Sequence, residues 1–352
     1  MSDMTTLQLG LAAIGAVVLI VMAVQATWSS RKNQPRQPTP VEPGAGPVDS
    51  LSLPGEGIEP ELDAVAFDAA HFPRPTPEKK AAMDALIDVL APIALESVVS
   101  GDVALAAMPA TRRVGSKPFS VEGLNQTTQQ WEVPQGGQRY TQFQAGVQLA
   151  NRSGALSEIE YSEFVMKTQG FCDAINGTPD FPEMREEVAR ARELDQFAGE
   201  HDAQLGFCLQ ARRAAWSPGY VQQNVARHGF VAGAIPGRMV LPASTVGLPP
   251  VLTLNFDTQA ALADDPAQSA IRELSFSLDV PQVQCSEQAF ARMREIAVAL
   301  AAEMDGVITD DSGIPLPLEA MDQISTDLEG LYDTLQQRDL AAGSALARRL
   351  FS

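Results

Sequence analysis

The side chains that could take part in catalysis are few in this sequence. Its histidines are His71, His201 and His228. None of them has a second metal ligand at a useful spacing, so no zinc site or other metal site is predicted. His228 follows an expected helix, where a favourable contact with the negative end of the helix dipole explains it.

Two acidic pairs and one basic pair are the other candidates for polar chemistry. Asp264-Asp265 and Asp310-Asp311 could supply an acid and a base. Both stand beside proline, serine or glycine, so we interpret them as turns. Arg212-Arg213 could bind an acidic peptide tail, although a solvated loop is the simpler interpretation. No phosphate-binding glycine loop or nucleophile elbow occurs, and neither an enzyme nor a cofactor is predicted.

Cysteine usage and net charge exclude further classes of protein. The cysteines Cys172, Cys208 and Cys285 are far apart and odd in number. We expect buried free thiols in a reducing compartment rather than a disulfide framework. The formal net charge is −19, and lysine and arginine are not clustered. A nucleic-acid surface needs such clusters, so no nucleic-acid partner is predicted.

An uncharged apolar segment, from Leu7 to Trp28, predicts a transmembrane helix. It has the roughly 20 residues that a helix needs to cross the hydrocarbon core. Trp28 suits the headgroup boundary, and Arg31 and Lys32 follow it, whereas the N-terminal side has no lysine or arginine. The positive-inside rule therefore places the N-terminus outside and the rest of the chain in the cytoplasm. A signal peptide would have a positive start and a shorter apolar core.

The next segment, residues 29–60, is rich in proline and glycine. Such a composition cannot bury a core, so we expect a flexible linker. Its random-coil reach is on the order of 30 Å, enough for a folded region to search a shell beneath the bilayer.

Three stretches beyond the linker, 202–211, 252–256 and 274–278, alternate apolar and polar residues as strands do. Because successive side chains of a strand point to opposite faces, the apolar set must share one buried face. That set is Leu252, Leu254, Phe256, Leu274, Phe276 and Leu278. The opposite, more exposed face then carries Thr253, Asn255, Ser275 and Ser277.

Helical signals alternate with these strands. Ser217 before Pro218 predicts a helix that ends near Arg227 or His228. Ser286 is the expected N-cap of a helix that ends before Gly306. The other expected elements are a strand at 307–309 and a helix at about 318–335. The predicted fold class is α+β, with mostly antiparallel sheets and helices on one face.

The sequence also allows a degenerate duplication. Residues 181–186 resemble residues 290–295, and two alternating stretches precede each. The earlier stretches, 140–149 and 159–166, would correspond to 251–256 and 274–278. The chain would then consist of an anchor at 1–28, a linker at 29–60, α+β units at 61–199 and 200–336, and a C-terminal tail at 337–352.

The ordered combination of these segments resembles the ZipA family of bacterial cell division proteins. The apolar span, the boundary Trp28-Ser-Ser-Arg-Lys32 and the linker come first. Near the end, 278–282, 290–304 and 306–311 look like the last strand–helix–strand segment of the family's C-terminal domain. The resemblance covers about 1–45 and 200–336.

This resemblance implies a single-pass protein of the bacterial inner membrane, with a periplasmic N-terminus. Its cytoplasmic domain would bind the C-terminal peptide of FtsZ on the exposed face of a sheet, and would link the cytokinetic ring to the membrane during septum assembly. The matching positions are Gly206, Cys208, Ile235, Thr253, Asn255, Ser275 and Ser277. The family has an apolar groove there, whereas most of these residues are polar. Self-association would be a further partner interaction. The alternative functions are a membrane-anchored scaffold for another envelope complex and, less favoured, a membrane-tethered hydrolase.

Overall fold

The computed structural model describes residues 35–38, 83–263 and 269–352. The expected membrane span, its boundary residues Trp28, Arg31 and Lys32, and most of the expected linker lie outside the described residues. Within the described residues, no helix has the length and apolar character needed to cross a bilayer. The fold is α+β with antiparallel sheets, as the sequence predicts.

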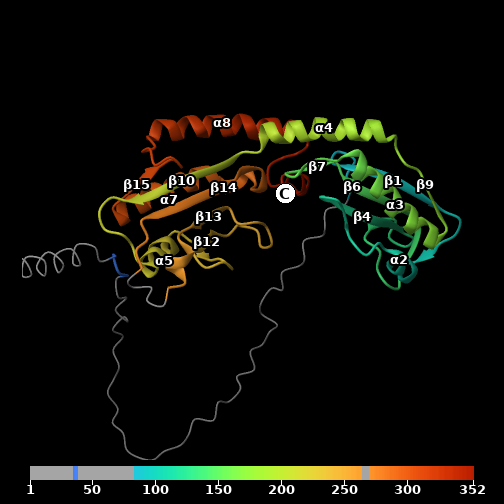
Figure 1. Ribbon diagram of the computed structural model, residues 1–352, viewed down its shortest axis with the longest axis horizontal. Helices are drawn as coiled ribbons and strands as arrows, with labels where there is room; N and C mark the ends of the chain where they lie inside the picture. Colours follow the sequence, from blue (N-terminus) through green and yellow to red (C-terminus); the bar gives the residue numbers. More distant parts are fainter. Residues whose placement is uncertain (1–34, 39–82, 264–268) are drawn as a thin grey trace, which may run out of the picture.

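Two main sheets divide the described structure into two units (Figure 1), and β7 and β8 form a small third sheet. The first unit runs from β1 to α4, and its main sheet has the order β3-β4-β6-β1-β9. Its elements are β1 (Asp88–Leu95), β2 (Val99–Ser100), α2 (Gly101–Ala107), β3 (Arg113–Val114), β4 (Lys117–Asn125), β5 (Trp131–Glu132), β6 (Arg139–Gln148), β7 (Ala150–Asn151), β8 (Gly154–Ala155), α3 (Glu158–Ile175), β9 (Gly177–Pro179) and α4 (Met184–His201).

The second unit runs from β10 to α8, and its sheet has the order β11-β12-β13-β14-β10-β15. Its elements are β10 (Gln204–Ala211), α5 (Pro218–Arg227), β11 (Val231–Ala232), β12 (Arg238–Leu241), β13 (Leu252–Asn255), α6 (Thr258–Ala261), β14 (Glu273–Asp279), η2 (Val280–Gln282), η3 (Cys285–Glu287), α7 (Ala289–Met304), β15 (Gly306–Thr309) and α8 (Leu318–Gln337). A last helix, α9 (Ala345–Leu350), follows.

The predicted strands and helices of the second unit are present as β10, α5, β13, β14, α7, β15 and α8, whereas β11, β12 and α6 were not predicted. Ser217 caps α5 as predicted, because its side chain accepts a hydrogen bond from the Tyr220 backbone N–H. The N-cap of α7 was expected at Ser286, and that prediction is wrong. Ser286 lies within η3, and the N-cap is Gln288 in a left-handed conformation, φ 50°.

One face of the second sheet is buried under α7. The six apolar side chains that were assigned to this face are all buried, and they share one core cluster with Phe290, Met293 and Leu300 of α7. The alternation therefore determined both the strands and the face that each side chain occupies.

Five strands of each main sheet share the same order and connectivity. The path β1–α2–β3–β4–β6–α3–β9–α4 corresponds to β10–α5–β12–β13–β14–α7–β15–α8. Both crossover helices end at a left-handed residue before a glycine: Asn176 before Gly177, and Asp305 before Gly306. Thus α3, not the segment at 181–186, corresponds to α7. The expected strand at 159–166 lies inside α3, so the sequence match paired elements that are not equivalent.

Residues 337–352, for which the sequence predicts only a C-terminal tail, return to the first unit. The side chains of Leu340, Leu350 and Phe351 are buried in the first unit's core. In the second unit, the Gln282 amide donates to the carbonyl oxygens of Arg348 (3.3 Å) and Phe351 (2.8 Å). The C-terminal segment therefore contacts both units.

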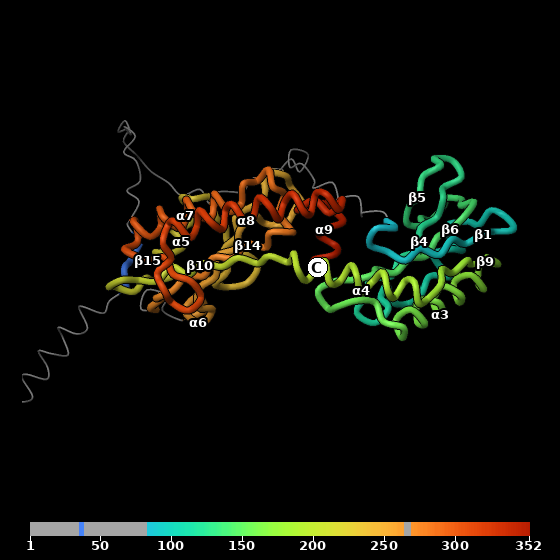
Figure 2. Tube along the Cα trace, turned by 90° about the horizontal axis from the view of Figure 1, so that it is seen from above, coloured from blue at the N-terminus to red at the C-terminus, as the bar shows by residue number. Residues whose placement is uncertain are grey.

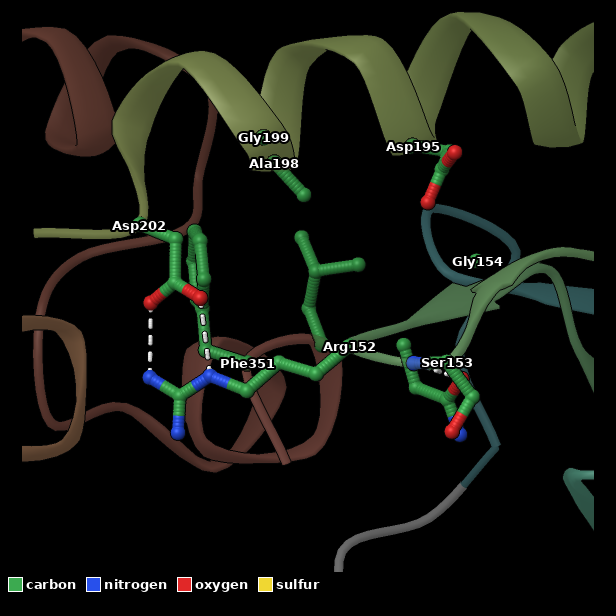
Figure 3. Close-up of a pocket in the computed structure, with 10 residues that line it drawn as sticks. Arg152, Ser153, Gly154, Asp195, Ala198, Gly199, Asp202 and Phe351 are labelled. Atoms are coloured by element: carbon green, nitrogen blue, oxygen red, sulfur yellow. Dashed lines mark hydrogen bonds and ion pairs between the residues drawn. The ribbon is translucent and has the colours of Figure 1, made fainter.

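A single arginine also joins the units. Arg152, which follows β7, makes two bonds to Asp202 (2.6 and 2.8 Å) and two to Asp279 (2.7 and 2.8 Å). Figure 3 shows the guanidinium facing Asp202 at the end of α4, beside Phe351. In Figure 1, α8 and α4 follow one another above this junction, and Figure 2 shows that they are offset to either side. Near their facing ends, the Arg338 guanidinium lies over the Phe197 ring.

Truncation of Phe351 tests the role of the C-terminal segment. Phe351 is 1% exposed, so we expect Phe351→Ala to lower the free energy of unfolding by about 3–5 kcal/mol. Equilibrium urea unfolding measures this change. The control is Ile159→Ala, at an apolar position that is 83% exposed, where we expect a change within about 0.5 kcal/mol. Equal effects of the two substitutions would contradict the packing of this segment.

Candidate functional site

The open face of the second sheet gathers the residues that the strand alternation predicts. Ser277 on β14 pairs with Gly206 on β10 and with Thr253 on β13. Ser275 pairs in the same way with Cys208 and Asn255. Antiparallel pairing therefore brings these six residues, which are far apart in the sequence, onto two adjacent rows of one surface.

A groove of about 550 Å³ crosses this face, and we call it the polar groove. Gly206, Thr253, Ser275 and Ser277 line it. Its other polar lining residues are Gln204, Arg238, Asp279, Gln282 and Asp311. Cys208 and Asn255 lie on the same face but outside this lining, and Cys208 is only 7% exposed.

A second cavity of about 530 Å³, the apolar pocket, adjoins the polar groove. It contains the remaining predicted residue, Ile235, and the two cavities share Arg238 and Pro250 in their linings. Ile235 is 53% exposed and Val246 is 82% exposed. The pocket wall is completed by Val240, Pro242, Ala243 and Leu248, among others. Exposed apolar side chains beside polar groups are typical of a ligand-binding surface.

Sequence reasoning missed most of this pocket. Val246, Leu248 and Pro250 belong to the connection between β12 and β13, which has neither helical nor strand periodicity. Periodicity therefore cannot indicate what these residues contact. The available signal was a stretch with several prolines and a glycine, residues 242–250, that is too long for a tight hairpin turn.

The Asp310-Asp311 pair forms a turn, as expected. The Asp310 carboxylate accepts hydrogen bonds from the backbone N–H groups of Ser312 (2.9 Å) and Ile314 (2.8 Å), and Gly313 has φ 79°. This turn places Asp311 over the open face. A Cβ atom built on Gly206 would lie 3.3 Å from the Asp311 Oδ1.

The remaining candidates for polar chemistry do not form a site in the described part of the chain. Arg212 and Arg213 are exposed and outside both cavities, whereas Asp264 and Asp265 lie outside the described residues. His201 stacks on Phe197, and His228 caps α5 with its Nε2 3.5 Å from a Glu303 carboxylate oxygen. No group of three potential metal ligands occurs among the described side chains.

A family comparison bears directly on this surface. Residues 256–327 match the family model described as ZipA, C-terminal FtsZ-binding domain. The resemblance to ZipA is confirmed. The matched segment contains β14, α7 and β15, and therefore Ser275, Ser277 and Asp311 of the open face. A search of curated proteins gave no match.

The cysteines have different surroundings in the structure. All three are free thiols, but only Cys172 and Cys208 are buried, whereas Cys285 is exposed. The expectation that all three would be buried is thus wrong for Cys285, which lies in the short η3 segment outside the sheet. Burial, together with the nearby Glu273 carboxylate, raises the pKa of the Cys208 thiol to about 11. Burial likewise raises the pKa of Cys172 to about 11.

Thiol alkylation tests this arrangement. Only the thiolate reacts, so at pH 8 we expect Cys285 to react with iodoacetamide at least tenfold faster than Cys172 or Cys208. Peptide mass spectrometry over time measures the three rates in one sample. Urea-unfolded protein is the control, in which the three rates should converge. Rapid modification of Cys208 in the folded chain would contradict its position between β14 and β15.

Proposed function

We propose that this chain is a membrane tether whose second unit binds the C-terminal peptide of FtsZ. It would thereby link the cytokinetic ring to the inner membrane during septum assembly. The observation that carries this proposal is the match of residues 256–327 to the FtsZ-binding domain, on a unit whose sheet has an open, grooved face. Such a role needs no catalysis, and none is proposed.

The two cavities are proposed to bind different parts of the peptide. The apolar pocket can bury one or two apolar side chains of a peptide, each contributing about 1.5–3 kcal/mol on full burial. The polar groove offers the hydroxyl groups of Ser275 and Ser277 to peptide backbone groups, whereas Thr253, which also lines it, is buried with 9% of its surface exposed. Because the polar part contributes mainly orientation, we expect a modest affinity for a single peptide.

The two units are proposed to be a degenerate duplication with different roles. In the first sheet, Gly146 pairs with Leu90 and occupies the place that Ser277 has in the second sheet. The chain itself lies there: a Cβ atom on Gly146 would be 2.4 Å from the Met83 Sδ, and the Met83 N–H donates to Glu122 (3.1 Å). The first unit also lacks the long β12–β13 connection that builds the apolar pocket. Peptide binding is therefore assigned to the second unit alone.

Membrane attachment rests on the sequence. The uncharged segment at 7–28 is proposed to span the inner membrane, with Trp28, Arg31 and Lys32 at the cytoplasmic boundary and the N-terminus in the periplasm. The segment at 29–60 would be a flexible linker that lets the second unit reach FtsZ at a distance from the bilayer. A modest peptide affinity becomes strong when many tethers face one polymer, because each bound tether raises the effective concentration of the next.

A blocked groove tests the proposed binding site. Ser277 is exposed in the middle of the polar groove, so Ser277→Trp should fill it and reduce binding to FtsZ at least tenfold. The matched control is Ser162→Trp on the exposed face of α3, which should bind like the wild type. Pulldown against FtsZ with and without its C-terminal peptide measures both effects. Wild-type binding that survives removal of the peptide, or equal binding by the two variants, would contradict the proposal.

Removal of residues 7–28 tests the anchor. We expect the shortened chain to leave the membrane fraction, because about 20 apolar residues supply its attachment. The control keeps these residues in scrambled order, which preserves their hydropathy and should preserve membrane attachment. Cell fractionation and immunoblotting give the readout. A shortened chain that stays in the membrane fraction would refute the anchor.

A further inference from the structure

Two side chains of opposite charge stand at different ends of the polar groove. Asp311 lies over Gly206 on β10, beside the sheet edge that β15 forms. Arg238 begins β12 and lines both the polar groove and the apolar pocket. Strands β14 and β13, with Ser277 and Thr253, lie between these positions. A line from Asp311 through Arg238 to the apolar pocket therefore runs across the strands.

Asp311 is the carboxylate of this surface that remains available to a ligand. Asp279 also lines the groove, but both of its oxygens bind Arg152. Glu273 accepts from Gln210 and Cys208, and Asp310 accepts from the backbone of its own turn. Asp311 is exposed and makes no ion pair with any described residue, so its charge is not neutralised within the described structure.

Arg238 is held firmly by its backbone while its side chain stays exposed. Its N–H donates to the Ile235 carbonyl (3.0 Å), and its own carbonyl accepts from the Gly233 N–H (2.8 Å). In the described part of the chain no carboxylate lies within ion-pair distance of its guanidinium. A guanidinium of this kind suits a carboxylate ligand, with which it can form two parallel hydrogen bonds.

We infer that the bound peptide crosses the strands of the second sheet with a fixed order of side chains. An apolar side chain occupies the apolar pocket, an acidic side chain binds Arg238, and a basic side chain binds Asp311. The inference rests on the proposed function, and it adds that charge order, not only apolar burial, selects the peptide. Asp311 and Arg238 are thus the specificity-determining residues of the groove. Asp311 also supplies a local attraction for a basic group, and such an attraction weakens as salt increases.

Substitutions that neutralise Asp311 or Arg238 test the proposed order of peptide side chains. Asp311→Asn and Arg238→Gln should each weaken binding of the FtsZ C-terminal peptide about three- to tenfold, as expected for partly exposed charged hydrogen bonds. The matched controls are Glu329→Gln on α8 and Arg185→Gln on α4, exposed residues of the same charge outside both cavities. Fluorescence anisotropy with labelled peptide and the purified full chain gives each Kd at low and high salt, and thermal unfolding checks that every variant is folded.

Altered peptides test the two proposed charge contacts separately. A peptide with its lysine and arginine residues changed to glutamine should lose the effect of Asp311→Asn and keep that of Arg238→Gln. A peptide with neutral amides in place of its acidic side chains should show the reverse. If the wild-type chain does not bind the peptide at all, the proposed function fails and this inference fails with it. If the wild type binds while Asp311→Asn or Arg238→Gln changes Kd less than twofold, or no more than its control, only the charge order is overturned.

Discussion

One-sided burial of the second sheet is the constraint on which the rest of this structure depends. Leu254, Phe276 and their neighbours on alternate positions pack against α7, so the intervening side chains must point to the other face. Those side chains are short and polar, and a serine at position 277 leaves room where a larger residue would fill the surface. The polar groove is thus a direct consequence of how the core is built.

The connection between β12 and β13 adds what the strands alone do not provide. It brings Val246 and Leu248 to the end of the open face, next to Ile235 and Arg238. Apolar burial and hydrogen bonding are then supplied by adjacent parts of one surface. Such a division is typical of peptide-recognition surfaces, in which pockets provide specificity and polar groups fix the orientation of the bound segment.

The two units are joined by contacts that return from the end of the chain. Phe351 is buried in the first unit, Gln282 of the second unit binds its carbonyl, and Arg152 bridges Asp202 and Asp279. These contacts involve groups from three distant parts of the sequence, so the first unit is packed against the second and is not joined to it by the chain alone. On the corresponding face of the first sheet, Met83 packs on Gly146. There the same fold holds a segment of its own chain.

The sequence by itself determined the α+β class, the elements β10, α5, β13, β14, α7, β15 and α8 of the second unit, and the face of the sheet that Gly206, Thr253 and Ser277 occupy. These properties follow from short-range periodicity, because alternation fixes the side of a strand on which each residue lies. Only the tertiary structure decided the equivalence of α3 and α7, the return of residues 337–352 and the placement of Asp311 over Gly206. Each depends on strand pairing or on turn geometry between distant residues, which no local pattern records. For the same reason the apolar pocket, made by an irregular connection, was accessible only through the folded structure.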